Sequence, residues 1–500
     1  MKKYFKNKTV VALLLAAGLT LSSCSRDYLE TEPTTSIDYT SAITNLENLT
    51  TVLNGMHRNM YVRQNSSQGQ NGGTAVLIYM DVMGDDLIFP STGNGWFVST
   101  LRWLDNNNAS SGNVFYPYRF YYGQIANANI IINNADKVEV AGSDIAKRDR
   151  VLGEAYAFRA YAYSMLVQIY GKRYVPGSTN SQLGVPLRLD ESINPIPRAT
   201  VEEVYASINS DLEKASSLLN GKARANKSHF DYKVVRGLMA RVALTQGRYA
   251  DAATFANQAR QGYTLMDNET YKKGFNNYEV GEWMWGYHII EEQSDYFGNF
   301  MAYMSRNYNS TQIRSAPKVV NKNLYNMFPA SDVRTQVIDP TGQHTALALP
   351  SNYAKFPYTS QKFLSVSNDK SLGDIPFMRA AEMYLIEAEA LARTGQEAAS
   401  KAVFTILEKN RNPEYTTTTA TGAAYIEQIM NSRRLELWGE GFRWLDLKRL
   451  ALPLDRTGAN FVGSVINNLY TVSPTDKRWT WLIPQGEINN SGGVVVQNEL

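Results

Sequence analysis

Cysteine is almost absent from this sequence: among 500 residues there is one, Cys24. A single thiol cannot form a disulfide within the chain, so the fold has to be stabilised by buried apolar surface and by hydrogen bonds. A chain of this length can bury a core that is large enough to do so. Cys24 therefore needs an explanation other than a structural crosslink.

Histidine and the common catalytic motifs are also scarce. The chain contains no GxSxG elbow, no P-loop, no HExxH and no CxxC sequence. Its four histidines show no metal-ligand spacing, and we interpret each as an incidental or core residue: His57, His229, His288 and His344. The sequence therefore predicts a protein that is not an enzyme, with no metal and no cofactor.

Long apolar runs are absent apart from one at the amino terminus. Residues 10–21 form an apolar stretch that is too short to span a bilayer comfortably, and four lysines precede it, which is typical of a secretory signal. The run ends in "LSSC", which resembles a bacterial lipobox, where the signal is cut before a cysteine that carries a diacylglyceryl group. We expect residues 1–23 to be a lipoprotein signal peptide, Cys24 to be the lipid anchor, and residues 24–39 to be a flexible tether. The alternative is an ordinary secreted protein with a stray thiol.

An excess of one charge sign is missing as well. The chain has 50 basic and 47 acidic residues, and removal of residues 1–23 takes away four lysines and leaves a net charge of −1. This balance argues against nucleic acid or an anionic bilayer as the partner. Aromatic residues are plentiful instead, with 31 Tyr, 18 Phe and 8 Trp, which suits stacking and neutral hydrogen bonding.

Helical periodicity dominates most of the chain. In residues 201–219 apolar side chains recur at helical spacing, and Thr200 and Glu203 form a capping box before them. Two later stretches, 232–263 and 379–410, each indicate two short helices around a glycine, with small residues where the helices approach. This is the layout of a tetratricopeptide helical hairpin, and a looser version precedes both stretches.

We therefore predict a mainly α fold, a scaffold of about four tetratricopeptide-like helical hairpins within one domain over residues 40–500. Two insertions interrupt the scaffold, at about residues 65–118 and 264–375. Both are rich in Gly, Asn, Tyr and Trp and show no sustained period. Long irregular segments in a regular scaffold usually carry function, so we expect the binding site there.

Aromatic side chains of these two insertions are the candidates for ligand binding. Sugars present flat C–H faces that lie on aromatic rings and hydroxyl groups that bond to amide and charged side chains. Some of the rings could instead bury the insertions against the scaffold, and we expect two or three of the set to be exposed. The rings that we single out are Trp96, Trp283, Trp285, Tyr296 and Tyr308.

Two groups of charged residues admit both a catalytic and a structural interpretation. Asp85 and Asp86, close to Asp81, could supply the carboxylate pair of a glycosidase, but adjacent residues project in different directions, and helix capping is the interpretation we favour. The stretch "NSRRLELWGEGFRWLDLKRL" carries opposite charges three or four residues apart. We expect this ladder to fix a helix in place rather than to catalyse a reaction.

Six motifs in order resemble the SusD/RagB family of outer-membrane nutrient-binding lipoproteins of Bacteroidetes. They are "YYGQIANANIII", "LGVPLRLDESINPIPRATVEEVYASINSDLEKASSLL", "MARVALTQGRYADAATFA", "FMRAAEMYLIEAEALARTG", "RRLELWGEGFRWLDLKRL" and "LIPQGEINNSGGVVVQN". Two departures are Ser432, where relatives usually carry Glu, and a carboxyl terminus that stops where many continue with Pro-Gly-Tyr. The resemblance implies four tetratricopeptide-like hairpins with irregular insertions and, as partner, a SusC-like TonB-dependent β-barrel that this protein covers as a hinged lid.

The resemblance and the aromatic insertions together predict a cell-surface lipoprotein of the outer membrane that captures an oligosaccharide or polysaccharide and delivers it to the transporter. The acidic tether is similar to the surface-export signal of such lipoproteins. A peptide ligand is the first alternative, because the RagB branch resembles peptide-import systems and a fold does not dictate ligand chemistry. A surface glycosidase and a tetratricopeptide adaptor for protein tails are the others.

Overall fold

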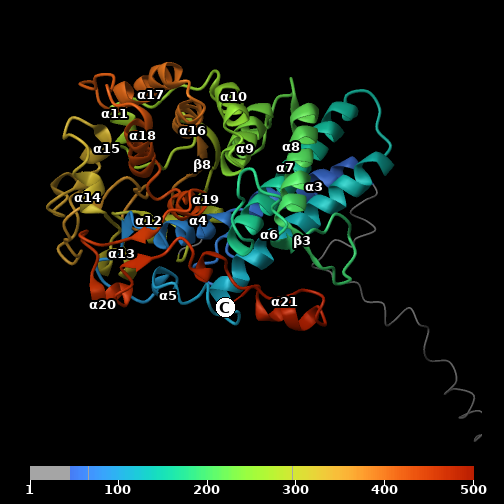
Figure 1. Cartoon of the computed structure of the whole chain (residues 1–500), viewed down its shortest axis with the longest axis horizontal. Coiled ribbons are helices and arrows are strands. Elements are labelled where there is room, and N and C mark those ends of the chain that lie inside the picture. The colour runs from blue at the N-terminus through green and yellow to red at the C-terminus, as the bar shows by residue number, and fades with distance from the viewer. Residues whose placement is uncertain (1–44, 66, 295–296, 500) are drawn as a thin grey trace, which may run out of the picture.

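The computed structural model describes residues 45–65, 67–294 and 297–499, and Figure 1 shows the path of the chain. The predicted signal peptide, the predicted lipid anchor Cys24 and the predicted tether lie outside the described residues. None of the helices in the described ranges is long and apolar enough to cross a membrane. The fold is mainly α, as the sequence predicts.

Long helices form the scaffold. They are α3 (Leu46–Asn59), α6 (Gly112–Asn134), α7 (Asp144–Tyr170), α8 (Val201–Leu219), α9 (Tyr232–Thr245), α10 (Tyr249–Arg260), α16 (Ala380–Arg393), α17 (Glu397–Arg411) and α18 (Gly422–Glu436). Most of them pack against their neighbours in chain order: α6 on α7, α7 on α8, α9 on α10, α10 on α16, and α16 on α17. In Figure 1 the series runs across the molecule from α3 and α6 to α16, α17 and α18.

Consecutive helices pair as hairpins, which confirms the predicted tetratricopeptide-like layout. The turn between α9 and α10 contains Gly247 at φ +70°, and a Cβ atom there would lie 2.6 Å from the ring of Pro176, so glycine is required. Small residues make the close approach possible, and they are fully buried: Ala240, Ala252, Ala256 and Ala259.

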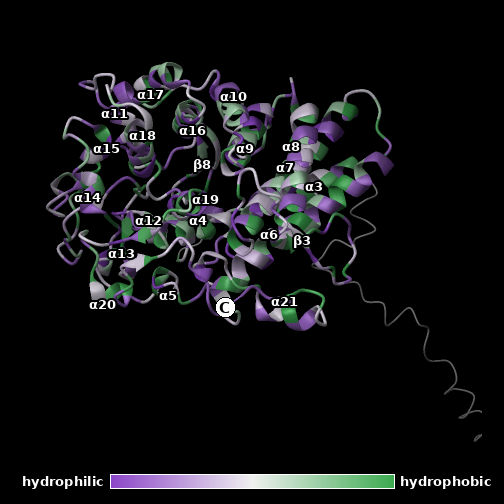
Figure 2. Cartoon of the chain, in the orientation of Figure 1, coloured by the Kyte–Doolittle hydropathy of each residue, from purple (hydrophilic) through white to green (hydrophobic). Residues whose placement is uncertain are grey.

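The helix α8 forms for the reasons that its sequence indicates. The Thr200 hydroxyl accepts a hydrogen bond from the Glu203 amide (3.2 Å), and the Glu203 carboxylate accepts one from the Thr200 amide (2.8 Å), which completes the predicted capping box. Its apolar residues form one buried stripe: Val201, Val204, Ile208, Leu212 and Leu219. Figure 2 shows hydrophobic and hydrophilic residues alternating along the scaffold helices in this way.

The first insertion, at about residues 65–118, contains more helix than its pattern indicates. It includes α4 (Gly72–Val82), whose residues are all buried, and the short α5 (Val98–Leu101). A helix that is buried on every side has no polar face, so it shows no amphipathic period. For this reason the sequence pattern missed α4.

The second insertion, at about residues 264–375, consists of short elements joined by loops. They are α11 (Asn268–Tyr271), β4 (Trp283–Tyr287), η3 (Glu291–Gln293), α12 (Phe300–Met304), α13 (Thr311–Ser315), β5 (Val319–Val320), α14 (Lys322–Tyr325), α15 (Val333–Gln336), β6 (Ile338–Asp339), η4 (Thr345–Leu347) and β7 (Thr359–Ser360). Three of its strands join β1 (Leu87–Ile88) in an antiparallel sheet of order β1-β5-β7-β6. This sheet links the two insertions to each other.

The remaining elements connect the scaffold or close the carboxyl-terminal region. They are η2 (Ala135–Lys137), β2 (Leu183–Pro186), β3 (Arg198–Thr200), β8 (Ile375–Arg379), α19 (Arg443–Arg449), β9 (Leu454–Asp455), α20 (Gly463–Ile466), β10 (Thr471–Val472), η5 (Lys477–Trp479) and α21 (Gln485–Asn490). The strand β8 pairs antiparallel with β4 of the second insertion and leads directly into α16.

Most charges of residues 431–450 are buried, and several of them bond to distant elements. Glu436 accepts hydrogen bonds from Arg379 (2.8 Å) and Arg411 (3.0 Å), and Glu440 accepts from Lys362 (2.7 Å). The structural interpretation of this stretch is therefore correct. The expected pairing within one helix holds for Asp446 and Arg449 of α19 (2.8 Å), but Glu436 and Glu440 pair elsewhere, because an interruption between α18 and α19 directs their side chains towards other parts of the fold.

Candidate functional site

Trp96 lies on a tight, exposed loop between β1 and α5. The Gly95 amide donates to the Thr92 carbonyl (2.9 Å), and Gly95 has φ +91°, which suits glycine. The second insertion holds this loop in place, because the backbone N–H of Asn94 donates to the side-chain oxygen of Gln312 in α13 (3.4 Å). The indole of Trp96 is half-buried, and residues 92–95 before it are exposed.

Neighbouring segments fix one side of the Trp96 ring. Tyr303 of α12 lies with its ring centroid 5.9 Å away, and a Cβ atom on Gly69 would lie 3.4 Å from the indole carbons. Phe297, which is 46% exposed, precedes Gly298, and Gly298 in turn packs against residue 68. The chain segments of Asn94, Trp96 and Phe297 thus approach the segment of Gly69, and we call this area the Trp96 surface.

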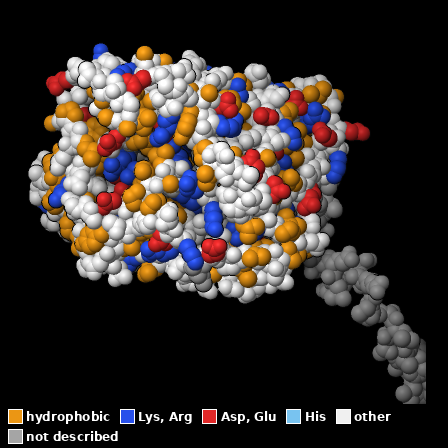
Figure 3. Space-filling view, in the orientation of Figure 1, with side chains coloured by type: hydrophobic (Ala, Val, Ile, Leu, Met, Phe, Trp, Pro, Cys, Tyr) orange, Lys and Arg blue, Asp and Glu red, His pale blue; other side chains and the backbone are white. Residues whose placement is uncertain are grey.

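The Trp96 surface is aromatic and neutral. The rings of Trp96 and Phe297 offer apolar faces, and the side-chain amide of the exposed Asn94 can donate and accept hydrogen bonds. On the face of the molecule shown in Figure 3, basic and acidic side chains are intermixed without a large area of one sign. The arrangement can hold a neutral polar ligand by stacking and hydrogen bonding.

Three of the predicted rings are not accessible, which corrects the sequence prediction. Trp283 and Trp285 are 0% exposed and Tyr308 is 1% exposed. The strand β4, which carries both tryptophans, is buried on both faces. Trp285 packs edge-on against Tyr161 (5.3 Å) and Phe230 (4.9 Å) in the core. Tyr296 lies outside the described residues, so its role stays a prediction.

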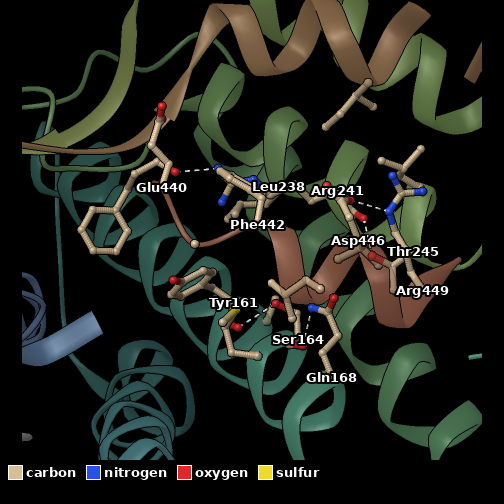
Figure 4. Close-up of a pocket in the computed structure, with 18 of the residues that line it drawn as sticks. Tyr161, Ser164, Gln168, Leu238, Arg241, Thr245, Glu440, Phe442, Asp446 and Arg449 are labelled. Atoms are coloured by element: carbon tan, nitrogen blue, oxygen red, sulfur yellow. Dashed lines mark hydrogen bonds and ion pairs between the residues drawn. The ribbon is translucent and has the colours of Figure 1, made fainter. Parts of the chain in front are cut away.

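An interior cavity lies between α7, α9 and residues 440–449, and Figure 4 shows the side chains that line it. Its volume of about 70 Å³ holds a few waters but no sugar ring. The charged groups that line it are already paired: Arg241 with Glu382 (2.6 Å) and Arg449 with Glu389 (2.7 Å). Residues 440–449 fill this face of the hairpins. It therefore offers no open groove for a protein tail, which a tetratricopeptide adaptor would need.

A wider hollow of about 550 Å³ lies on the surface beside α14, α17 and α18. Phe328 and Tyr415 contribute rings, and the four threonines of residues 416–419 contribute hydroxyl groups. Of its three carboxylates, Asp332 and Glu408 are both bound to Arg334, and Glu414 is exposed. This hollow is another place where a neutral polar ligand fits, and the sequence did not indicate it, because its walls come from scaffold helices as well as from an insertion.

The acidic cluster has a structural role. Arg443 binds Asp85 (2.5 Å), and Arg434 binds Asp86 (2.6 Å). The Asp81 carboxylate accepts a hydrogen bond from the Gly441 amide (2.8 Å), and burial raises its pKa to about 7. All three side chains are buried, so none is placed to attack or protonate a glycosidic bond.

Two histidines and a glutamate that are far apart in the sequence converge in the interior. His57 Nε2 lies 2.8 Å from Glu154 Oε2, and His229 Nδ1 lies 2.9 Å from the same oxygen. Burial alone would raise the pKa of Glu154, but the hydrogen bonds from His229 and His57 lower it to about 2. The sequence analysis missed this cluster because the spacing between its members is too long to form a local motif.

Comparisons with known proteins agree with this architecture. Residues 27–244 match a family described as "Starch-binding associating with outer membrane", and residues 246–500 match the SusD family. SusD-like protein P38 of Formosa agariphila is 26% identical over 392 residues, which cover 69% of this chain and 74% of that protein. The amino-terminal match associates the chain with the outer membrane.

Solved structures show the same fold. A SusD-like carbohydrate binding protein from Bacteroides vulgatus has a TM-score of 0.77 at 23% identity and covers 90% of this chain and 97% of its own. Surface glycan-binding protein A from Bacteroides thetaiotaomicron has a TM-score of 0.70 at 17% identity, over 92% of this chain and 100% of its own. Because the SusD family match alone spans residues 246–500, just over half of the sequence, the chain belongs to the SusD family, whose members are binding proteins rather than enzymes.

Proposed function

We propose that this chain is a cell-surface lipoprotein that captures an oligosaccharide or polysaccharide at the Trp96 surface and delivers it to a SusC-like TonB-dependent transporter. One observation carries the choice of site. Of the predicted rings that the structure describes, Trp96 alone keeps part of its face exposed, and it stands on a loop that both insertions hold. A fixed ring loses little conformational entropy when a sugar stacks on it.

The comparisons support a glycan as the ligand class. Two proteins of the same fold are described as a carbohydrate binding protein and a surface glycan-binding protein, and the match over residues 27–244 is described as starch-binding. The chemistry of the Trp96 surface agrees with this class, because aromatic rings and a neutral amide recognise hydroxyl-rich ligands without a charge partner.

The proposals for membrane anchoring and for delivery to a transporter are based on the sequence motifs. Cys24 would hold the mature chain on the outer membrane through its lipid, and the transporter complex would supply the energy of import. Cys24→Ser tests the anchor: we expect the variant to leave the membrane fraction, whereas an unchanged distribution contradicts lipidation. Co-purification of the membrane-bound protein with a TonB-dependent β-barrel tests the partner.

Affinity electrophoresis against plant, host and microbial polysaccharides tests the ligand. We expect the protein from residue 27 onwards to be retarded by one class of polymer, and we expect Trp96→Ala to lose the retardation, with a smaller loss in Phe297→Ala. Tyr415→Ala is the matched control, because its ring lies in the separate surface hollow beside α14, α17 and α18. Loss in Tyr415→Ala with full binding by Trp96→Ala places the glycan in that hollow instead.

A peptide is the alternative ligand. Suppose that no polysaccharide retards the protein, that it binds members of a peptide library, and that Trp96→Ala weakens this binding. The Trp96 surface would then still be the binding site, but its ligand would be a peptide. Release of sugar from any polymer would contradict a binding protein altogether.

A further inference from the structure

The cluster of His57, Glu154 and His229 has no role in the proposed glycan site. Its members come from three separate parts of the scaffold: His57 from the last turn of α3, Glu154 from the middle of α7, and His229 from the loop before α9. One ligating atom of each residue lies within 4.8 Å of the others. Phe158 and Phe230 pack around the His57 ring, at centroid distances of 4.7 and 5.7 Å, and give the cluster apolar walls.

The carboxylate of Glu154 is the feature that requires an explanation. It is 0% exposed, and among the described residues neither a lysine nor an arginine forms an ion pair with it. A buried carboxylate is costly unless a cation compensates its charge. Within the described ranges, the two imidazoles are the only polar side chains that contact it, so we expect the countercharge to lie within this cluster.

The donor atoms match the preferences of zinc. Two imidazole nitrogens and a carboxylate are borderline ligands that suit Zn²⁺, whereas Ca²⁺ and Mg²⁺ require oxygen-rich sites. His57 Nε2 and His229 Nδ1 both lie within 2.9 Å of Glu154 Oε2, so the chain offers three ligand atoms, and a water would complete a tetrahedral coordination. We propose that His57 Nε2, His229 Nδ1 and the Glu154 carboxylate bind one zinc ion.

The site needs only a small adjustment to accept the ion. Zinc bonds of about 2.0–2.2 Å place neighbouring ligand atoms roughly 3.3 Å apart, so the carboxylate moves outward by about 0.5 Å from each imidazole. The Phe230 amide donates to Oε2 (3.1 Å) and orients the carboxylate from outside the cluster. The side chain of His229 is 12% exposed and gives the ion a route from the solvent.

The position of the site indicates a structural role. α3 is the first helix of the described chain, and the ion would join its last turn to α7 and to the start of α9. Zinc would thereby tie this first described helix to the middle of the scaffold. This inference is independent of the glycan proposal, because Trp96 takes no part in the cluster.

Metal analysis of the purified protein tests the proposal. We expect about one zinc per chain after purification without chelators, and the metal-free protein to bind Co²⁺ with the visible absorption of a four-coordinate site. His229→Gln and the isosteric Glu154→Gln should each lower zinc affinity by at least about 100-fold, since losing a ligand costs no less than losing an outer-shell partner. His288→Gln is the matched control, because His288 also bonds a carboxylate, Asp374 (2.9 Å), but lies outside the cluster.

Each result decides for or against the site. X-ray absorption showing two imidazole ligands per zinc supports it even where a variant fails to fold. Wild-type protein that takes up no stoichiometric zinc or cobalt overturns it, and so does a folded His229→Gln that binds zinc as tightly as the His288→Gln control.

Discussion

Arg443 of α19 holds Asp85, 358 residues earlier in the chain, by two hydrogen bonds: Nε to Oδ1 at 2.5 Å and Nη2 to Oδ2 at 3.0 Å. Both side chains are largely buried. Burial raises the pKa of Asp85, but the guanidinium groups of Arg443, Arg434 and Arg456 together outweigh this effect and hold it below the ordinary value. The pair fastens the carboxyl-terminal helices to the first insertion, which carries the Trp96 surface.

Removing this guanidinium should destabilise the fold. In Arg443→Met the buried Asp85 loses its bidentate partner, and we expect the free energy of unfolding to fall by about 3–5 kcal/mol. Urea denaturation measures the change. Arg248→Met is the control, because Arg248 pairs with Asp251 at the surface, where such pairs contribute about 0–1 kcal/mol. Equal losses in the two variants would contradict a special role for the Arg443 pair.

Asp81 should give the protein a measurable pH dependence. Burial raises its pKa to about 7 in the folded state, so between about pH 4 and pH 7 the folded protein binds more protons than the unfolded chain. The contribution of Asp81 to stability is therefore present at low pH and is lost as the pH rises through this window, by at most about 4 kcal/mol.

The Asp81→Asn variant isolates that contribution. Its side-chain carbonyl can still accept the hydrogen bond from the Gly441 amide (2.8 Å), but it does not titrate. Urea denaturation at pH 5 and pH 8 should show that wild type loses more stability than Asp81→Asn on going to pH 8. Parallel changes in both proteins would place the pKa of Asp81 near its usual range.

Local signals in the sequence were enough to predict the scaffold. The capping box at Thr200 and Glu203 and the buried alanines of the α9–α10 hairpin depend on neighbours within a few residues, and the structure confirms them. α4 was missed, because a fully buried helix has no amphipathic period. The partners of Glu436 and Asp85 lie tens to hundreds of residues away, so no local pattern could indicate them.

The candidate site was only partly predictable for a related reason. Irregular sequence indicated exposure, but the second insertion passes through the interior at β4 and buries Trp283 and Trp285 there. A signal was present in "WMWGY", which has no polar residue and so fits a strand with both faces buried. Trp96 differs, because it follows "STGNG", a run of turn residues that indicates an exposed loop.

Core and surface tryptophans should therefore respond differently to truncation. Trp285→Ala removes a ring that packs on Tyr161, Phe230 and Phe377, and we expect it to cost about 3–5 kcal/mol of stability. Trp96→Ala should cost much less stability and should abolish ligand retardation. Urea denaturation and affinity electrophoresis on both variants check this division. A Trp285→Ala protein that is fully stable but no longer binds ligand would show that Trp285 belongs to the binding site after all.

Ser432 offers a test of how one buried charge cluster is balanced. The Ser432 hydroxyl donates to Glu408 (2.5 Å) and accepts from Arg334 (2.7 Å), while Arg334 also binds Glu408 (2.8 Å) and Asp332 (2.6 Å). In this chain Glu408 thus supplies a carboxylate beside position 432, where the family resemblance leads us to expect Glu. A second carboxylate at that position would lie against the first with no additional cation.

We expect Ser432→Glu to lower the free energy of unfolding by about 3 kcal/mol or more, because it buries a like charge next to Glu408. Adding Glu408→Ser to this variant exchanges the two side chains and returns one carboxylate to Arg334, so the double variant should recover most of the loss. Urea denaturation of the wild type, both single variants and the double variant completes the cycle. Strictly additive losses would show that the two positions do not share Arg334, because a shared cation makes the second substitution compensate for the first.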